Sequence, residues 1–200
     1  MSRFLVYFLP VPGHAFPVLE VARGLVAHGH EVVVYTGKRF ESRVLGIGAR
    51  YIPIPPGGDF DYDRIQERFP DLKGLTGLAS LKCYIKQVFM DPIPEQVRFI
   101  SPFVEQFRPE VVLTDTTVGP AKSLSMSGGM PWAVLNIVPI SLSSRFTGAV
   151  CKAVHQVLHQ PQFRETARRF QAECKAYPGS SLAVNLLEKL ARTQAPVVRC

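Results

Sequence analysis

Two residues far apart in the chain, His14 and Asp115, have side chains that together could move a proton. His14 follows an apolar run over residues 4–9 and stands just before a helical pattern that begins at Pro17, while Asp115 ends the apolar run PEVVLTD. A histidine near neutral pH can take a proton from a hydroxyl group. A carboxylate bonded to its other ring nitrogen would fix the tautomer and stabilise the positive charge that develops. The two residue types would therefore form a general base that activates a hydroxyl for attack on an electrophile.

Whether the two side chains meet depends on the elements that carry them. The continuous apolar run over residues 4–9 is typical of a strand buried on both faces. A helix from Pro17 to a terminal Gly29, a strand over residues 31–35, a short helix over 38–45 and a strand over 49–55 follow in turn. This alternation predicts the α/β class, with a doubly wound, Rossmann-like parallel sheet.

The later part of the chain continues this pattern and then changes. Residues 55–91 form a loop-rich insertion with one or two helices, after which we expect a helix over 93–107 that Pro102 breaks or kinks. A strand over 109–115, a helix over 119–127 and a strand over 130–140 complete the sheet. Beyond that we expect two amphipathic helices, at residues 163–174 and 182–190. The predicted domains are therefore residues 1–148, the sheet domain, and residues 149–200, a C-terminal helical segment.

In the usual strand order 3-2-1-4-5 the first and fourth strands are neighbours at the topological switch point. His14 and Asp115 would then line one crevice at the carboxyl edge of the sheet. Each residue also has a plain structural explanation, because a histidine can cap a turn and an aspartate can cap the next helix. Both interpretations stay open at this point.

Other sites of chemistry are not evident in the sequence. There is no G-x-G-x-x-G or Walker motif, and the second strand ends in Thr36-Gly37 without the acid that would hold a dinucleotide ribose. The four cysteines form no C-x-x-C pair, and the GGDFDYD loop lacks the distal glutamate of a calcium loop. His155 and His159 lack a third ligand, and His28 and His30 are expected at the surface. We predict neither a metal site nor a bound cofactor.

The net charge of +7 is concentrated at the C-terminal end, where residues 151–200 hold eight basic and three acidic residues. These charges alternate with apolar positions, which favours a solvated helix face over a nucleic-acid surface. No apolar stretch approaches the roughly 20 residues of a membrane-spanning helix, and the N-terminus lacks the features of a signal peptide. We therefore expect a cytoplasmic protein without an integral membrane segment and without a nucleic-acid partner.

Two stretches resemble a known family. VPGHAFPVLEVARGLVAHGHEVVVYTG resembles the N-terminus of the UDP-dependent glycosyltransferases of the GT-B fold, especially the macrolide-type branch, and FRPEVVLTDTTVGPAKSLSMSGGMPWAVLNIVPIS resembles the later part of their acceptor domain. The resemblance implies that His14 is the general base and Asp115 its supporting carboxylate. The implied reaction is the inverting transfer of a hexose from a UDP-sugar, the co-substrate, to a hydroxyl of a small lipophilic acceptor, without a metal.

The same resemblance implies that the insertion over residues 55–91 shapes the acceptor pocket. Aromatic side chains there would line it, although a core role is the alternative for each: Phe60, Tyr62, Phe69, Tyr84 and Phe89.

The C-terminal stretch HQPQFRETARRFQAECKAYPGSSLAVNLLEKLARTQAPV resembles the last helices of the same family, which return to the N-terminal domain. The chain passes to this tail near residues 150–155, and no stretch resembles the motif that holds uracil, ribose and diphosphate. The resemblance therefore implies an incomplete glycosyltransferase that lacks the donor domain and works with a separate donor-domain chain. The alternative is a non-catalytic acceptor-binding or regulatory module. Apolar faces that a donor domain would cover are expected to be exposed.

Overall fold

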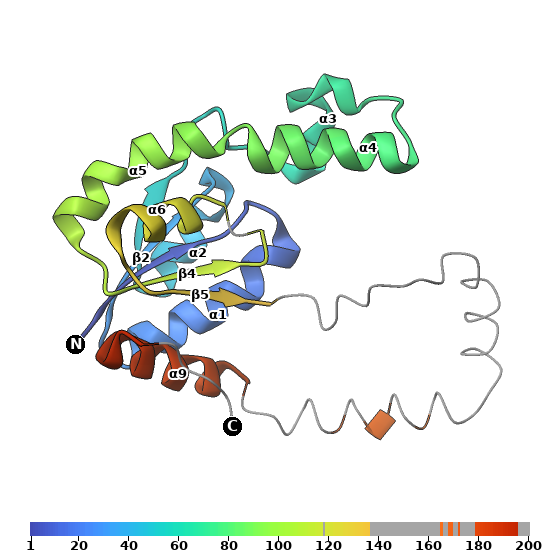
Figure 1. The fold of residues 1–200 in the computed structure, drawn as a ribbon. Helices are drawn as coiled ribbons and strands as arrows, with labels where there is room; N and C mark the ends of the chain where they lie inside the picture. The colour runs from blue at the N-terminus through green and yellow to red at the C-terminus, as the bar shows by residue number, and fades with distance from the viewer. Residues whose placement is uncertain (118, 137–164, 166–167, 170–171, 173–178, 196–200) are drawn as a thin grey trace.

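The computed structural model describes residues 1–117, 119–136, 165, 168–169, 172 and 179–195 (Figure 1). Its centre is a five-stranded sheet in the order β3-β2-β1-β4-β5, in which every neighbouring pair is parallel. The predicted doubly wound α/β sheet and its strand order are confirmed. The strands are β1 (Arg3–Tyr7), β2 (Glu31–Thr36), β3 (Arg50–Pro53), β4 (Val111–Asp115) and β5 (Trp132–Leu135).

Helices connect the strands and cover both faces of the sheet. The longer ones are α1 (Pro12–Ala27), α5 (Ile93–Phe107) and α9 (Gly179–Thr193), with α2 (Glu41–Gly46) and α6 (Ala121–Gly128) as shorter connections. The insertion after β3 contains the turns η2 (Tyr62–Arg64) and η3 (Pro70–Leu72), the helices α3 (Ile65–Arg68) and α4 (Gly77–Tyr84), and the π-helical segment η4 (Ile85–Met90). One further 3₁₀ turn, η1 (Lys38–Phe40), precedes α2.

Alternate residues of each strand face opposite sides, and each side is packed by its own helices. Phe4, Val6 and Leu113 face α1 and α9, whereas Leu5 and Val112 face α5 and α6. Figure 1 shows α9 beside α1 on one side of the sheet and α5 with α6 on the other. Both faces of the central strands are covered, as their continuous apolar sequences require.

The predicted start of one helix is wrong and the break considered in another is absent, and both differences involve proline. The predicted limits of the second helix, residues 93–107, are confirmed. Helix α1 begins at Pro12 instead of Pro17, because a proline in the first helical position loses no hydrogen bond and its fixed φ suits the helix. Helix α5 runs through Pro102 to Phe107 without a break. Pro102 is exposed, so the carbonyl that loses its partner one turn earlier can bond to water.

The helix predicted over residues 182–190 is confirmed as part of α9, but its buried face differs in part from the predicted stripe. Leu187 and Leu190 are buried, together with Val184, in the core that α1 shares, whereas Leu182 and Leu186 are only partly buried. The two helices approach closely at Gly24, where an added Cβ would lie 2.8 Å from a methyl group of Val184.

The prediction of a surface position is wrong for His30, whose side chain is only 11% exposed. His28 and His30 both contact Glu188 of α9 at 2.8 Å, and the His30 ring also packs edge-on against Phe4. These contacts join α9 to the sheet. Within the helix predicted at residues 163–174, the described residues 165, 168–169 and 172 are helical, and the other positions lie outside the described residues. Also outside the described residues are the boundary at 148/149, His155, His159, Cys151, Cys174 and Cys200.

Candidate active site

Asp115 is the last residue of β4, and its side chain is completely buried. Because β4 lies beside β1, the carboxylate comes next to the backbone that leaves β1. The Leu9 N–H donates to Oδ2 at 3.1 Å, the Thr117 N–H donates to Oδ1 at 2.7 Å, and the Thr117 hydroxyl also donates to Oδ1. These donors satisfy a buried charge that would otherwise be costly.

His14 lies in the first turn of α1, and its ring reaches back toward β4. The Nδ1 atom is 3.0 Å from Oδ2 of Asp115, and the side chain is 21% exposed. An ionised carboxylate can only accept hydrogen bonds, so Nδ1 carries the ring proton in this contact. Nε2 then has a free lone pair, and it has no hydrogen-bond partner among residues 1–117 or the other described parts of the chain. The arrangement presents a proton acceptor whose orientation a buried carboxylate fixes.

The structure therefore brings together the two residues on which the sequence analysis depended. The two structural explanations, a turn cap for His14 and a helix cap for Asp115, do not fully account for these contacts. The N-cap of α6 is Pro120, not Asp115, although Asp115 does cap the local turn at Thr117. The His14 ring contacts a side chain from a distant strand and not the backbone of its own turn.

Sequence reasoning missed Thr117, which holds the carboxylate on the side away from His14. The available signal was the short pattern Asp-x-Thr directly after a strand, since an aspartate oxygen often accepts from the backbone two residues further on.

Tyr7 and Gly119 pack under this loop. Tyr7 is buried, and desolvation together with the nearby charge of Asp115 raises the pKa of its phenol far above the usual range. Gly119 has a φ of +43°, and a side chain there would collide with the Tyr7 ring. Gly119 thus lies directly against the Tyr7 ring, where there is no room for a side chain.

The five aromatic residues predicted to bind an acceptor do not share one environment. Phe60 and Phe69 are buried in a cluster with Leu9, 5.8 Å apart between ring centroids. Tyr84 and Phe89 pack partly against this cluster, whereas Tyr62 is 44% exposed. Phe60 and Phe69 are core residues, although Phe69 also lines a cavity beside the cluster, and an acceptor-binding role for the five remains a prediction. Leu9 places the cluster at the carboxyl end of β1, the same end as His14.

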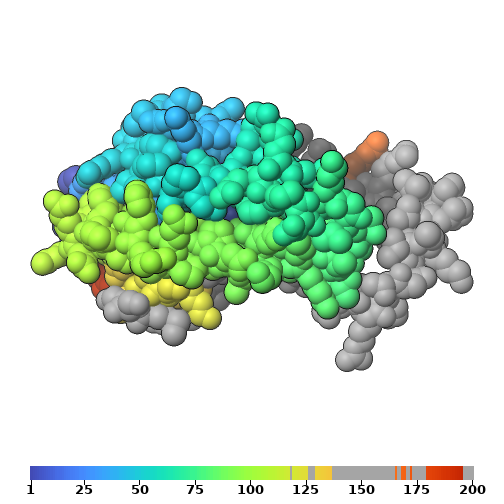
Figure 2. All heavy atoms as spheres, turned by 90° about the horizontal axis from the view of Figure 1, so that it is seen from above, coloured from blue at the N-terminus to red at the C-terminus, as the bar shows by residue number. Residues whose placement is uncertain are grey.

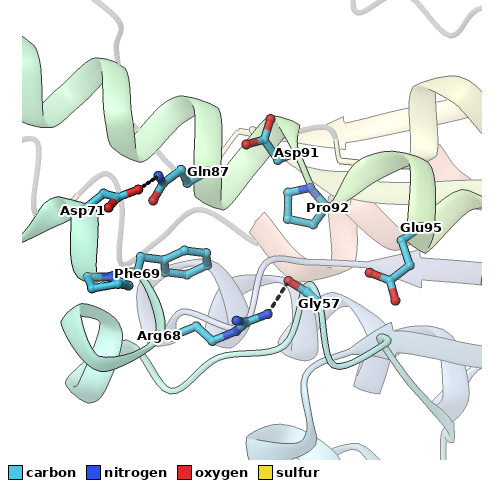
Figure 3. A pocket seen from close by; sticks show the side chains of 9 residues that line it. Gly57, Arg68, Phe69, Asp71, Gln87, Asp91, Pro92 and Glu95 are labelled. Atoms are coloured by element: carbon cyan, nitrogen blue, oxygen red, sulfur yellow. Dashed lines mark hydrogen bonds between the residues drawn. The ribbon is translucent and has the colours of Figure 1, made fainter.

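A cavity of about 360 Å³ adjoins this cluster (Figure 3). Arg68 lies along it and donates to the carbonyls of Pro56 and Gly57 at 3.2 Å, while Gln87 donates to Asp71 at 2.7 Å. A second cavity of about 820 Å³ shares Gly57 and Arg68 and has a more apolar lining that includes the side chains of prolines and Phe99. His14 lines neither cavity.

The described part of the chain contains no group of three or more His, Cys, Asp or Glu side chains placed to hold a metal ion. In the GGDFDYD loop, Asp61 and Asp63 pair with Arg39 at 2.6 and 2.8 Å, and Asp59 accepts from the Lys38 N–H. Within the same residues, no helix has the length and apolar character needed to cross a bilayer.

Comparison with known proteins gives relatives of one kind. No family model matches the chain. It is 36% identical over 146 residues to the 4'-demethylrebeccamycin synthase of Lentzea aerocolonigenes, covering 73% of this chain and 35% of that protein. It is 28% identical over 148 residues to UDP-glucosyltransferase A1 of Starmerella bombicola, covering 70% of this chain and 32% of that protein.

Solved structures agree in fold. The glycosyltransferase of kitacinnamycin matches with a TM-score of 0.55 at 23% identity, over 88% of this chain and 40% of that one. The calicheamicin glycosyltransferase CalG4 matches with a TM-score of 0.53 at 18% identity, over 79% of this chain and 41% of that one. The chain spans about a third of the length of the curated relatives it matches. The chain is thus related in sequence to glycosyltransferases over about a third of their length, and its sheet and strand order give it the GT-B fold of the solved ones.

Proposed function

We propose that this chain supplies the acceptor side of an inverting glycosyltransferase, with His14 as the general base. The acceptor hydroxyl oxygen attacks the anomeric carbon of a UDP-sugar, and the bond from that carbon to the β-phosphate oxygen breaks. The hydroxyl proton passes to Nε2 of His14, and UDP leaves with the bonding electrons. The observation that carries the proposal is the 3.0 Å contact between Nδ1 of His14 and a fully buried carboxylate.

Asp115 has the supporting role in this proposal. As the ring takes up the proton it becomes an imidazolium, and a carboxylate bonded to Nδ1 stabilises that charge without itself taking the proton. The backbone donors at Leu9 and Thr117 keep Asp115 in place while this happens. A general base positioned in this way contributes about 10²–10⁴-fold to a rate.

The acceptor in this proposal is a small lipophilic molecule held near the insertion after β3, and the sugar donor is a UDP-hexose. In this proposal residues 1–148 form the acceptor-binding domain, and residues 149–200 form a C-terminal helical segment whose helix α9 packs on α1. A separate donor-domain chain would hold the UDP-sugar, because a transferase gains much of its rate by positioning both substrates together.

The test compares transfer by the wild-type chain and by His14→Ala, with UDP-glucose and a set of phenolic and polyketide-like acceptors. Each reaction is run with and without a separately produced donor domain. We expect His14→Ala to lower transfer by about 10²–10⁴-fold while calorimetry shows unchanged acceptor binding. His28→Ala is the matched control, since His28 also contacts a carboxylate, at 2.8 Å, and should retain full transfer. Equal transfer by His14→Ala and the wild type would contradict the proposal.

A non-catalytic acceptor-binding or regulatory module is the second candidate. It is favoured by the fact that His14 lines neither of the two cavities beside the insertion. Acceptor binding without transfer, in the presence of a donor domain that binds UDP-glucose, would select this candidate.

A further inference from the structure

The helix α4 and the segment η4 carry apolar side chains on two opposite faces, and only one face is covered by the described residues. Tyr84 and Val88 pack onto the cluster around Phe60 and Phe69. On the other face, Leu78, Leu81 and Ile85 are 65%, 54% and 42% exposed. Their spacing of three and four residues places the three side chains in one row along the helix. We call this row the outer stripe.

The sequence between Asp71 and Asp91, which contains the outer stripe, has basic residues and no acidic ones. Residues 72–90 include Lys73, Lys82 and Lys86 and no Asp or Glu. Lys86 pairs with Asp91 at 3.0 Å, whereas Lys73 and Lys82 form no ion pair with the described residues. Lys82 follows Leu81 directly, so its ammonium group lies along one flank of the stripe. The exposed face is therefore apolar along its centre and positively charged at its side.

We propose that the outer stripe is a docking surface for an anionic lipid bilayer. Leu78, Leu81 and Ile85 enter the boundary between headgroups and acyl chains, and Lys73 and Lys82 contact the acidic headgroups. A row of large aliphatic side chains beside lysines is the arrangement by which a helix lies in the plane of a membrane interface. The inference goes beyond the proposed sugar transfer and does not depend on it.

Two other occupants fit the face less well. A small molecule needs a concave site, and the stripe residues line neither the 360 Å³ nor the 820 Å³ cavity. A second copy bound through the same face would bring the unpaired lysines of both copies together, because a two-fold contact repeats each charge across the interface.

The position of α4 suits contact with a flat surface. The helix lies at the far end of the layer formed by α3, α4 and α5 (Figure 1). Seen from above, this layer forms much of the surface, with the residues near 70–90 toward one end of it (Figure 2). The opposite face of the insertion packs on Leu9 at the carboxyl end of β1, so the outer stripe belongs to the element that adjoins this end of the sheet.

The test is co-sedimentation of the full 200-residue chain with vesicles of phosphatidylcholine, with and without phosphatidylglycerol, over a range of salt concentrations. The stripe variant carries Leu78→Gln, Leu81→Gln and Ile85→Gln, and its control is Leu45→Gln, which changes a leucine that is 57% exposed on α2. The charge variant carries Lys73→Gln and Lys82→Gln, and its control carries Lys122→Gln and Lys189→Gln. Circular dichroism and chemical denaturation establish that each variant is folded.

We expect the wild type to bind anionic vesicles with an affinity that falls as salt rises. The stripe variant should bind at least tenfold more weakly, and the charge variant roughly 25-fold more weakly at low salt, since each lysine near an anionic surface contributes about fivefold. Both controls should bind like the wild type. Failure of the folded wild type to bind anionic vesicles at low salt would overturn the proposal. So would wild-type binding by the stripe variant, equal binding to neutral vesicles, or a dimer in solution that the stripe variant abolishes.

Discussion

Replacement of Asp115 by asparagine tests whether the buried carboxylate is held as the structure describes. The side chain accepts from four donors, namely the N–H groups of Leu9 and Thr117, the Thr117 hydroxyl and the His14 ring. Asparagine keeps the shape but turns one acceptor oxygen into an amide NH₂ group. If the NH₂ group faces Thr117, the hydroxyl can rotate and accept, but the Thr117 N–H loses its partner. If it faces the other way, the His14 ring can change tautomer, but the Leu9 N–H loses its partner.

The expected loss of stability follows from the number of hydrogen bonds that lose a partner. In either orientation one buried backbone N–H is left unsatisfied, which costs about 1–3 kcal/mol, and the remaining bonds lose the strength that a charged acceptor gives them. We therefore expect Asp115→Asn to lower the free energy of unfolding by about 2–4 kcal/mol. Chemical denaturation of the 200-residue chain measures this as a shift of the midpoint at unchanged slope.

Two comparisons make the measurement decisive. Asp59→Asn changes an aspartate that accepts one backbone N–H in an exposed loop, and it should cost about 1 kcal/mol or less. His14→Ala leaves Asp115 with its other three donors, so it too should cost about 1 kcal/mol or less. A loss for Asp115→Asn no larger than that for Asp59→Asn would refute the described hydrogen bonding. A large loss for His14→Ala would show that the ring serves the fold and not a reaction.

Three further predictions concern the rest of the molecule. Gly24→Ala should lower the free energy of unfolding by about 1–2 kcal/mol, because the added Cβ would lie 2.8 Å from a methyl group of α9. Gly46→Ala has open space around the added Cβ, so it should be neutral or stabilise the fold by up to about 1 kcal/mol. Midpoints of chemical denaturation test both. Hydrogen bonds from His30 and His28 hold the pKa of Glu188 in the folded chain below its ordinary value of 4.5. The contribution of Glu188 to stability, about 0.5–1 kcal/mol, is therefore complete above pH 4.5 and is lost as the pH falls through the lowered pKa of the folded chain. Glu188→Gln should remove this acid-range slope from the stability measured against pH. Burial raises the pKa of Tyr51 and of Tyr84 to about 12, so stability should fall as the pH rises from 10 toward 12, and phenolate absorbance of the folded chain should show these groups ionising late.

The strand order and the meeting of His14 with Asp115 were predictable because both depend on long, strongly patterned segments. A run of β-branched and aromatic residues identifies a buried strand, and the alternation with helices limits the topology to a few orders. In the order observed, β4 is adjacent to β1, and residues that follow the two strands must come together at one edge. The sequence therefore predicted the location of the site without any knowledge of side-chain geometry.

Features that depend on single side-chain contacts were not predictable in this way. Both Pro12 and Pro17 are compatible with a helix start, so the sequence alone does not distinguish the two positions, and α1 begins at the earlier one. The position of Glu188 between two histidines depends on how α9 lies against α1, which no local pattern encodes. The burial of Phe60 and Phe69 results from the packing of an irregular insertion, where periodicity gives no information.

The His14–Asp115 pair is assembled from three short segments of the chain. The donors to Asp115 come from Leu9, His14 and Thr117, so the base and its support need only the segments around β1, α1 and β4. The packing of α9 against α1 steadies the helix that carries His14 without contributing a group to the pair. In the proposed reaction, an oriented base accelerates transfer only when a UDP-sugar is held beside the acceptor hydroxyl. Transfer should therefore depend steeply on whatever holds the donor, whereas the His14–Asp115 geometry should be complete in this chain by itself.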